Sequence, residues 1–120
     1  RRRISNLSPR LSNEALITEL IAIVDSFNLG LAFLKENKVA QDGVTLIRNQ
    51  LEELLKRYGL KKIDIKIGDD FDPNFHEAIG EIESKELAGK IAEQVESGYT
   101  LHNKVIRPVR VNISKGQIKN

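Results

Sequence analysis

Apolar residues in the first third of the chain recur at the spacing of a helix. From residue 13 to about residue 35 they alternate at intervals of three and four, which places their side chains on one helical face. This row consists of Ile17, Leu20, Val24, Phe27, Leu31 and Leu34. Serine can cap exposed amides and proline is tolerated in a first turn, so the helix is expected to start near Ser8 and Pro9 or near Ser12.

The apolar stripe of this helix is too wide for one neighbouring helix to cover. Further apolar residues widen it, namely Leu16, Ile21, Ile23, Leu29, Ala32 and Phe33. A helix that is apolar on several sides requires several packing neighbours. We therefore expect more than one other helix around it.

A second helix is predicted from Gly43 to about Tyr58, with Asp42 as its cap. Its apolar side consists of Val44, Ile47, Leu51, Leu54, Leu55 and Tyr58, and its polar side of Arg48, Asn49, Glu52, Glu53 and Lys56. Gly59 follows, and a glycine after the last turn can take the left-handed conformation that ends a helix. Leu60 is then expected to fold back as the accompanying hydrophobic contact.

After Gly59 the apolar period changes from that of a helix to that of a strand. Ile63, Ile65 and Ile67 alternate with polar residues, and Val105, Val109, Val111 and Ile113 share parity near the end. Turn-forming residues fill 69–74, 83–90 and 102–104. The fold class predicted is α+β, with a helical hairpin followed by a small antiparallel β domain.

These patterns divide the chain into four parts. Residues 1–12 are interpreted as a tail or helix remnant, 13–59 as the hairpin, 60–115 as the β domain and 116–120 as a flexible tail. A hairpin with broad apolar stripes does not form a stable globule alone, whereas two hairpins make a four-helix bundle. We therefore predict a homodimer, held together by Ile17, Leu20, Val24, Phe27, Leu31, Ile47, Leu51 and Leu54.

The overall composition excludes several classes of protein. With 19 basic and 17 acidic residues, the net charge of +2 gives no general field that favours nucleic acid or anionic lipid. The absence of cysteine excludes disulfides and thiolate metal sites and is compatible with a reducing compartment. No uninterrupted apolar run approaches the roughly 18 residues of a membrane helix. We expect a cytoplasmic protein with no membrane partner.

Asp70, Asp72, Asn74 and Glu81 occupy four positions of a calcium-binding EF-hand loop. Phe75 stands where that loop requires glycine, and Pro73 lies inside it, so a tight Asx/Pro turn before a strand is favoured. His76 is expected to hydrogen-bond within this turn, and His102 to lie at a hairpin tip. Neither histidine has a recognisable orienting partner, so no metal site is predicted.

The sequence lacks the patterns of an enzyme or a nucleotide-binding protein. Gly89 and Gly98 are isolated, and no phosphate-binding loop or nucleophile elbow is present. No cofactor is therefore expected. Arg1, Arg2 and Arg3 have no interleaved aromatic residues for base stacking, so a solvated tail is favoured over a nucleic-acid contact.

Two blocks of sequence resemble the GrpE family of cochaperones. Phe71 to Ala78, followed by Ile82, Glu83 and Ser84, resembles the family pattern hydrophobic-Asp-Pro-Asn-x-His-x-Ala and then Val-Glu-Ser. The second block, Gly98-Tyr99-Thr100-Leu101 and then Val105 to Pro108, Val111 and Ile113, resembles the family's closing motif at the correct distance. Residues 20–27 and 43–54 resemble its two bundle helices, so the resemblance covers roughly residues 13 to 115.

The resemblance implies a function and a set of contacts. It implies a dimeric nucleotide exchange factor, not an enzyme, that binds the ATPase domain of a DnaK-type chaperone, opens its cleft and speeds ADP release. Partner contacts carried over by motif are Phe71, Val95, Lys104, Arg107 and Ile113 in the β domain and, more weakly, Phe33 in the bundle. Lys104 and Arg107 are expected to be exposed on the last hairpin, whereas core packing is an equal alternative for Phe71, Val95 and Ile113. Asp72, Pro73, Gly98 and Pro108 are assigned to fold geometry.

The sequence departs from the family pattern at three places. Leu29 stands where the family usually has arginine, Asn103 and Lys104 replace a common Gly-Arg pair, and the long N-terminal stalk helix is missing. We interpret the chain as a truncated or naturally shortened form. Two alternatives stay open: a dimeric β-domain adaptor without exchange activity, and a nucleic-acid binder that uses Arg1 to Arg3 and the basic hairpin.

Overall fold

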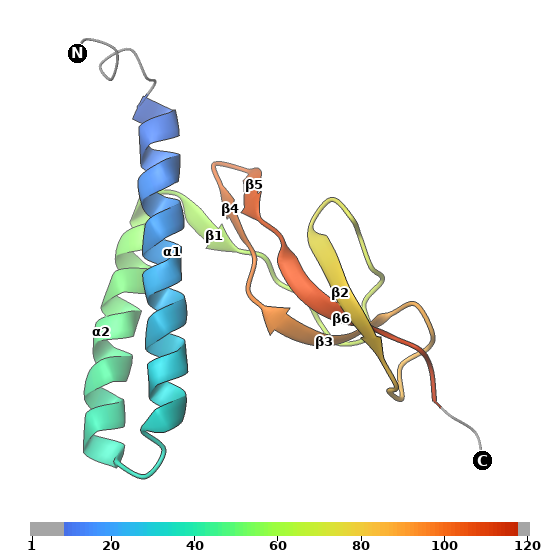
Figure 1. Cartoon of the computed structure of the whole chain (residues 1–120). Coiled ribbons are helices and arrows are strands. Elements are labelled where there is room, and N and C mark those ends of the chain that lie inside the picture. Colours follow the sequence, from blue (N-terminus) through green and yellow to red (C-terminus); the bar gives the residue numbers. More distant parts are fainter. Residues whose placement is uncertain (1–8, 118–120) are drawn as a thin grey trace. The chain divides into compact units, whose positions relative to one another are not determined.

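A computed structural model describes residues 9–117 of the chain (Figure 1). It divides into two compact units at the boundary between Gly59 and Leu60, and each unit is described by itself. Within the described residues the first unit contains two helices and the second contains six strands. The predicted α+β class is confirmed.

Helix α1 spans Pro9–Phe33 and therefore starts at the earlier of the two expected positions. The helix ends two residues before the predicted end at residue 35, because Leu34 N–H donates to Leu31 O in a tighter turn. The side chains that face the second helix are Ile17, Ile21 and Val24, which are all buried. Their spacing of four and three is that of a helix–helix seam.

Helix α2 spans Lys38–Arg57 and starts five residues earlier than predicted. Its cap is Asn37, whose Oδ1 accepts the Ala40 amide at 3.1 Å, so the prediction of Asp42 as the cap is wrong. Asp42 lies inside the helix and pairs with Lys38 at 3.5 Å, a normal i,i+4 contact. The helix ends before Gly59 as predicted, since Gly59 has φ +98°. Leu60 is buried as the first residue of a strand in the second unit.

The polar side of α2 also requires a correction. Arg48 and Glu52, predicted to be on the outer side, are half-buried, and Arg48 donates to Asn28 of α1 at 2.8 Å. Ile47 and Leu54 are instead 51% and 38% exposed. The prediction went wrong because it assigned every polar residue to solvent, whereas a long side chain such as arginine can lie in a seam and keep its charged end hydrogen-bonded.

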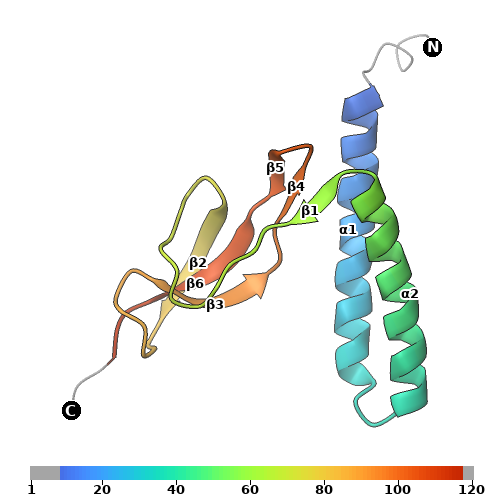
Figure 2. The same cartoon turned by 180° about the vertical axis from the view of Figure 1, so that it is seen from behind.

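The second unit contains two three-stranded sheets (Figures 1 and 2). The first has the order β1 (Leu60–Lys62), β4 (Tyr99–Leu101) and β5 (Lys104–Arg107). The second has the order β2 (His76–Ile82), β6 (Val109–Ser114) and β3 (Ile91–Glu96). Three of the pairings are antiparallel, but β2 runs parallel to β6. The expectation of a wholly antiparallel β domain is corrected in this one pairing.

The segment from Ile63 to Ile67 is not a strand, although its alternation predicts one. Ile63 N–H donates to Gly98 O, but Lys66 N–H donates to the Asp69 side chain at 2.8 Å instead of to a neighbouring strand. Ile63 and Ile65 nevertheless pack against the core. The alternation therefore reports burial on one side, not membership of a ladder.

The core of the second unit lies beneath the second sheet. Its fully buried side chains are Ile91, Val109 and Val111. Half-buried residues packed against them are Ile63, Ile65, Phe71 and Ile113. The shared parity of Val109 and Val111 thus marks the inward face of β6, as the alternation predicts.

One described helix is long and apolar enough to span a membrane by length and composition alone. It is the Asn13–Phe33 part of α1, with a mean hydropathy of 1.6 and only 17% of that window buried in the single chain. The earlier criterion of an unbroken apolar run does not detect it, because polar residues interrupt the segment. A bundle helix covered on several sides has the same composition, so this feature does not distinguish the two.

Candidate partner-binding surface of the β unit

The residues carried over as partner contacts lie on different elements. Val95 in β3 is 50% exposed and Lys104 at the start of β5 is exposed, whereas Phe71 and Ile113 are half-buried against the core. Phe33, at the end of α1 in the first unit, is 80% exposed. Within the second unit, Val95 and Lys104 therefore belong to two different sheets.

The turn before β2 is organised by Asp72. Its side-chain Oδ1 accepts the Asn74 amide at 2.9 Å, and its backbone oxygen accepts the amides of Phe75 and His76 at 3.0 and 2.8 Å. This is the Asx/Pro turn that the sequence favours over a calcium loop. The turn fixes the backbone next to Phe71 and leads directly into β2.

His76 closes the same turn from the other side. Its Nδ1 accepts a hydrogen bond from the Asp72 amide at 2.9 Å. The Phe71 ring lies against the imidazole with a centroid distance of 5.8 Å. The expectation that His76 hydrogen-bonds within its turn is confirmed, and the same contact holds Phe71 at the edge of the core.

The tip of the β4–β5 hairpin consists of His102 and Asn103, with φ of 50° and 69°. Two successive residues with positive φ form the type I′ turn that matches the twist of paired strands. His102 therefore lies at the hairpin tip, as predicted. Asparagine tolerates this conformation better than most residues, so Asn103 can occupy the position where the resemblance leads us to expect glycine.

Arg107 is not the exposed charge that the sequence suggests. Its side chain is only 20% exposed, and its Nη1 lies 2.9 Å from Glu96 Oε2. Its Nε donates to Ser97 O at 2.9 Å, and the guanidinium lies 5.4 Å from the centre of the Tyr99 ring. These contacts fix Arg107 within the unit, because three groups hold the planar guanidinium from different directions.

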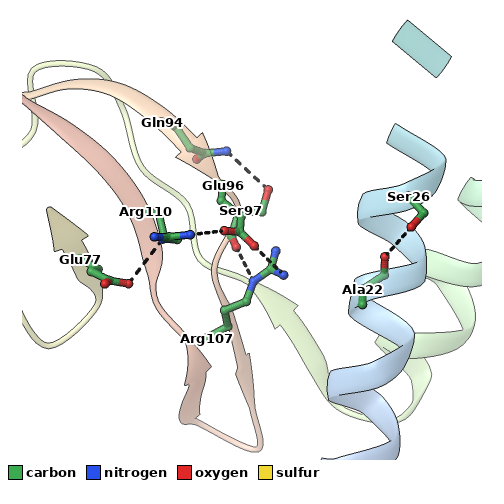
Figure 3. A network of polar contacts seen from close by, with 8 residues as sticks. All are labelled: Ala22, Ser26, Glu77, Gln94, Glu96, Ser97, Arg107 and Arg110. Atoms are coloured by element: carbon green, nitrogen blue, oxygen red, sulfur yellow. Dashed lines mark hydrogen bonds and ion pairs between the residues drawn. The ribbon is translucent and has the colours of Figure 1, made fainter. Parts of the chain in front are cut away.

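Glu96 extends this arrangement to a second arginine (Figure 3). Its Oε1 lies 3.2 Å from Arg110 Nη1, and Arg110 Nε lies 3.6 Å from Glu77 Oε1. The chain of charges thus runs Glu77, Arg110, Glu96, Arg107 across β2, β6, β3 and β5. We call these four residues the charge network.

Gly98 and Pro108 pack together where the strands pass from one sheet to the other. A Cβ atom on Gly98 would lie 2.4 Å from Val109 N and 2.6 Å from the Pro108 carbonyl carbon. Contacts this short are forbidden for any side chain, so glycine is required here by close approach of backbone. The assignment of Gly98 to fold geometry is explained by this contact.

Sequence reasoning missed the role of Ser114, which is the buried polar residue of the described core. Its hydroxyl donates to Glu86 O at 2.8 Å and accepts from Ser84 Oγ at 2.8 Å and from Gly116 N at 2.9 Å. Ser84, noticed only as part of a motif, therefore supports the loop between β2 and β3. The signal in the sequence is a serine at the last position of β6, a strand with alternating apolar residues. Alternation alone does not show which groups the serine hydroxyl bonds.

Asp70 and Lys90 form an ion pair beside an isolated bridge between their backbones. The hydrogen bond from Lys90, together with its positive charge, lowers the pKa of Asp70 below its ordinary value of 3.8. Asp70 and Asp72, two of the four candidate calcium ligands, thus have their oxygens engaged by Lys90 and by the turn. Within the described residues no group of three or more histidine, cysteine or acidic side chains is arranged to hold a metal ion.

The chain matches a known protein family over most of its length. The GrpE family model matches residues 5–115. Curated relatives include Protein GrpE of Oceanobacillus iheyensis, 35% identical over 109 residues, and Protein GrpE of Thermotoga maritima, 36% identical over 104 residues. The mitochondrial GrpE protein homolog of Debaryomyces hansenii is 39% identical over 106 residues.

The matches cover most of this chain but only part of each relative. They cover 88%, 86% and 81% of the chain, and 57%, 59% and 43% of the Oceanobacillus, Thermotoga and Debaryomyces proteins. The architecture and its site thus define a helical hairpin joined to a β unit that carries a charge network. The chain belongs to the GrpE family. Because that family includes a mitochondrial relative, membership does not decide the cytoplasmic location expected from composition.

Proposed function

We propose that this chain is the dimeric core of a nucleotide exchange factor, which binds the ATPase domain of a DnaK-type chaperone and accelerates ADP release. The observation that carries the proposal is family membership over residues 5–115, which includes both motif blocks. The fold gives these blocks concrete roles. The first forms the Asp72 turn, and the second forms the crossing at Gly98 and the hairpin that presents Lys104.

The dimer is supported by a second apolar row on each helix. On α1 this row is formed by Leu16, Leu20, Ile23 and Phe27, and on α2 by Val44, Ile47, Leu51 and Leu54, with Tyr58 directly after the end of α2. Both rows keep the spacing of three and four that gives a continuous helical face. Leu16, Ile23, Ile47, Leu54 and Tyr58 are exposed in the single chain.

The two rows lie on the same side of the hairpin. At 3.6 residues per turn, each row is offset by roughly 90° from the row that faces the other helix of the pair. In both helices the second row is reached from the inward row by a rotation in the same sense about the helix axis, viewed along the chain. In two antiparallel helices, rotations in the same sense place the two rows on the same side of the pair. The hairpin therefore has one broad apolar face, and a second copy of this chain supplies the matching cover in a four-helix bundle.

Ile17 and Val24, two of the residues expected in the dimer seam, are already buried within the hairpin. The remaining expected residues, Leu20, Phe27, Leu31, Ile47, Leu51 and Leu54, are half-buried or exposed. We assign Ile17 and Val24 to the hairpin seam and the rows described above to the contact between copies. A bundle of this kind also accounts for the apolar composition of α1 without a membrane.

The proposed surface for the chaperone is the β unit, with Lys104 and Val95 as its exposed contacts. Lys104 would pair with a carboxylate of the ATPase domain, and Val95 would cover apolar surface beside it. Phe71 and Ile113 support this surface from the core side. The weaker contact, Phe33, belongs to the first unit and is exposed enough to be tested separately.

The mechanism is a difference in affinity for two conformations of the chaperone. If the factor binds the open, nucleotide-poor conformation 100-fold more tightly, the coupling free energy is about 2.7 kcal/mol. Linkage requires that nucleotide weakens binding of the factor by the same ratio. No covalent step is involved in this mechanism.

The exchange proposal is tested by release of a labelled ADP analogue from a DnaK-type chaperone. The chain should increase the release rate in a saturable manner, and Lys104→Glu should raise the concentration for half-maximal effect by about tenfold, because it reverses one interface charge. Lys35→Glu, on an exposed residue between the helices, is the matched control. No acceleration at saturating chain would contradict the exchange proposal and favour the adaptor alternative.

The dimer is tested separately by sedimentation over a range of protein concentrations. Ile47→Lys should shift the equilibrium to monomer, because a charge would be buried in the proposed face. Val39→Lys, an exposed apolar residue outside both rows, should leave the dimer intact. A folded monomer at all concentrations would contradict the bundle.

A further inference from the structure

The two sheets of the β unit are joined by two strand crossings that lie against each other. One ribbon passes from β3 through Gly98 into β4, and the other passes from β5 through Pro108 into β6. The closest approach is between Gly98 and the backbone of 107–109. Because Gly98 has no side chain, the two ribbons meet there backbone to backbone.

The side chain of Glu96 joins the two sheets at this crossing (Figure 3). Glu96 is the last residue of β3 in the second sheet, and Arg107 is the last residue of β5 in the first sheet. The distance from Arg107 Nη1 to Glu96 Oε2 is 2.9 Å, while Glu96 Oε1 is engaged by Arg110 of its own sheet at 3.2 Å. One carboxylate therefore connects a cation from each sheet.

The arginine side of the connection is restrained as well. Arg107 Nε donates to Ser97 O, which lies in the crossing itself, and the guanidinium lies over Tyr99 of β4. The side chains of Arg107 and Glu96 are 20% and 30% exposed, so water screens this pair less than a pair at a rim. Ser97 and Tyr99 hold the planar guanidinium in place, so its pairing with Glu96 resists rotation of one sheet against the other.

We infer that Glu96 and Arg107 are positioning residues for partner binding, because they set the angle between the two sheets. This inference rests on the proposed function, in which Lys104 on the first sheet and Val95 on the second contact one partner. Neither Glu96 nor Arg107 needs to touch that partner. Their effect is to keep two separate contacts at the spacing that a single ATPase domain requires.

The consequence for affinity follows from conformational populations. If only a fraction of the free chain has the correct angle, the observed dissociation constant increases by the inverse of that fraction. A variant that is correctly aligned for about one tenth of the time would bind about tenfold more weakly. Once bound, it would be in the same conformation as the unaltered chain and would reach the same maximal exchange rate.

The test compares Glu96→Gln with Glu93→Gln. Both residues are glutamates of β3, but Glu93 accepts only from Asn112 of the neighbouring strand, at 2.9 Å, within the same sheet. Each variant is titrated into the ADP-release assay with a DnaK-type chaperone. We expect Glu96→Gln to raise the half-maximal concentration by about tenfold with an unchanged plateau, and Glu93→Gln to leave both values unchanged.

A second measurement follows the angle directly and does not require the partner. Residual dipolar couplings of backbone amides should fit one alignment tensor for both sheets in the unaltered chain and in Glu93→Gln. In Glu96→Gln and in Arg107→Lys, the couplings of β4 and β5 should require a different tensor from those of β2, β3 and β6. A merely structural role would lower the thermal midpoint and leave the single tensor intact.

The outcomes are distinguishable from failure of the proposed function. If the unaltered chain does not accelerate ADP release, the exchange proposal fails, and the tensor comparison still decides whether the pair fixes the angle. If Glu96→Gln behaves like Glu93→Gln in both measurements, the inference is overturned. It is also overturned if two tensors are observed but the half-maximal concentration stays the same in an active chain.

Discussion

Arg48 Nη1 on α2 donates to Asn28 Oδ1 on α1 at 2.8 Å, and this bond crosses the seam of the hairpin. Asn28 continues the row of Ile21 and Val24, where the spacing calls for an apolar residue. Within the described residues Arg48 Nε is buried without a hydrogen-bond partner, and Glu52 Oε1 lies 4.0 Å away. Asn28 is exposed, so the pair lies at the edge of the seam, where it fixes which turns of the two helices lie opposite each other.

The pair should therefore show a measurable coupling. Asn28→Ala is expected to lower the free energy of unfolding by about 1 kcal/mol, because it leaves the guanidinium with fewer acceptors. Arg48→Met should be nearly neutral, since it replaces a half-buried charge with a flexible apolar side chain. Urea unfolding of both single variants and the double variant, at one protein concentration, should give a coupling of about 1 kcal/mol. Strict additivity would contradict the contact.

Gly98→Ala should strongly destabilise the β unit. The added methyl group would lie 2.4 Å from Val109 N, and neither backbone can move without changing the crossing. We expect a loss of about 3 kcal/mol, at the upper end of overpacking effects. The control is Gly43→Ala, where nothing lies within 4 Å of the new atom and the higher helix propensity should add about 1 kcal/mol. Thermal unfolding followed by circular dichroism measures both, and equal effects would contradict this explanation.

Much of the fold could be predicted because its periodicities reflect burial directly. Ile17 and Val24 of the predicted helical row and the alternation of Val109 and Val111 mark inward faces. Ile63 to Ile67 has the same kind of alternation without a ladder, because one-sided burial does not specify which backbone groups pair. The parallel pairing of β2 with β6 joins segments about 30 residues apart, and local sequence contains no signal for it.

The candidate site could be predicted less well, since its chemistry depends on pairings across strands. The Asp72 turn follows from short-range rules for aspartate and proline. Arg107 was expected to be exposed because a hairpin charge usually is. Its partner Glu96 is 11 positions earlier in sequence and becomes adjacent only through the crossing, so local sequence does not predict the charge network.

Ser114→Ala should destabilise the chain more than Ser84→Ala. Removal of the Ser114 hydroxyl leaves Glu86 O without its donor and Gly116 N without its acceptor, at a fully buried site. Buried unsatisfied groups cost roughly 1–3 kcal/mol, so we expect a loss of about 2 kcal/mol. Ser84 is only half-buried, and its loss should cost about 1 kcal/mol. Chemical denaturation of both variants gives the order, and the reverse order would contradict the assigned network.

Asp70 should make the chain sensitive to acid. Its pKa is lowered in the folded state by Lys90, so the pair stabilises the fold at neutral pH. That contribution is lost as the pH falls from the ordinary value of 3.8 through the lowered folded-state value. Because the Asp70 side chain is 84% exposed, the effect should be small. Asp70→Asn should lower the thermal midpoint slightly at pH 7 and not at pH values near 2, whereas a constant difference across this range would contradict the linkage.

Asp72 distinguishes the turn from a calcium site most directly. In the turn, Oδ1 is needed only as an acceptor for the Asn74 amide, so the neutral amide of Asp72→Asn should be nearly as good. Asp72→Ala removes the acceptor and should cost about 1 kcal/mol. A calcium site requires the charge as well, because carboxylates supply most of its affinity. We therefore expect Asp72→Asn to have the same thermal midpoint as the unaltered chain. Millimolar calcium should leave the midpoints of both proteins unchanged. If calcium raised the thermal midpoint of the unaltered chain but not that of Asp72→Asn, the segment would be a metal site and the turn explanation would be contradicted.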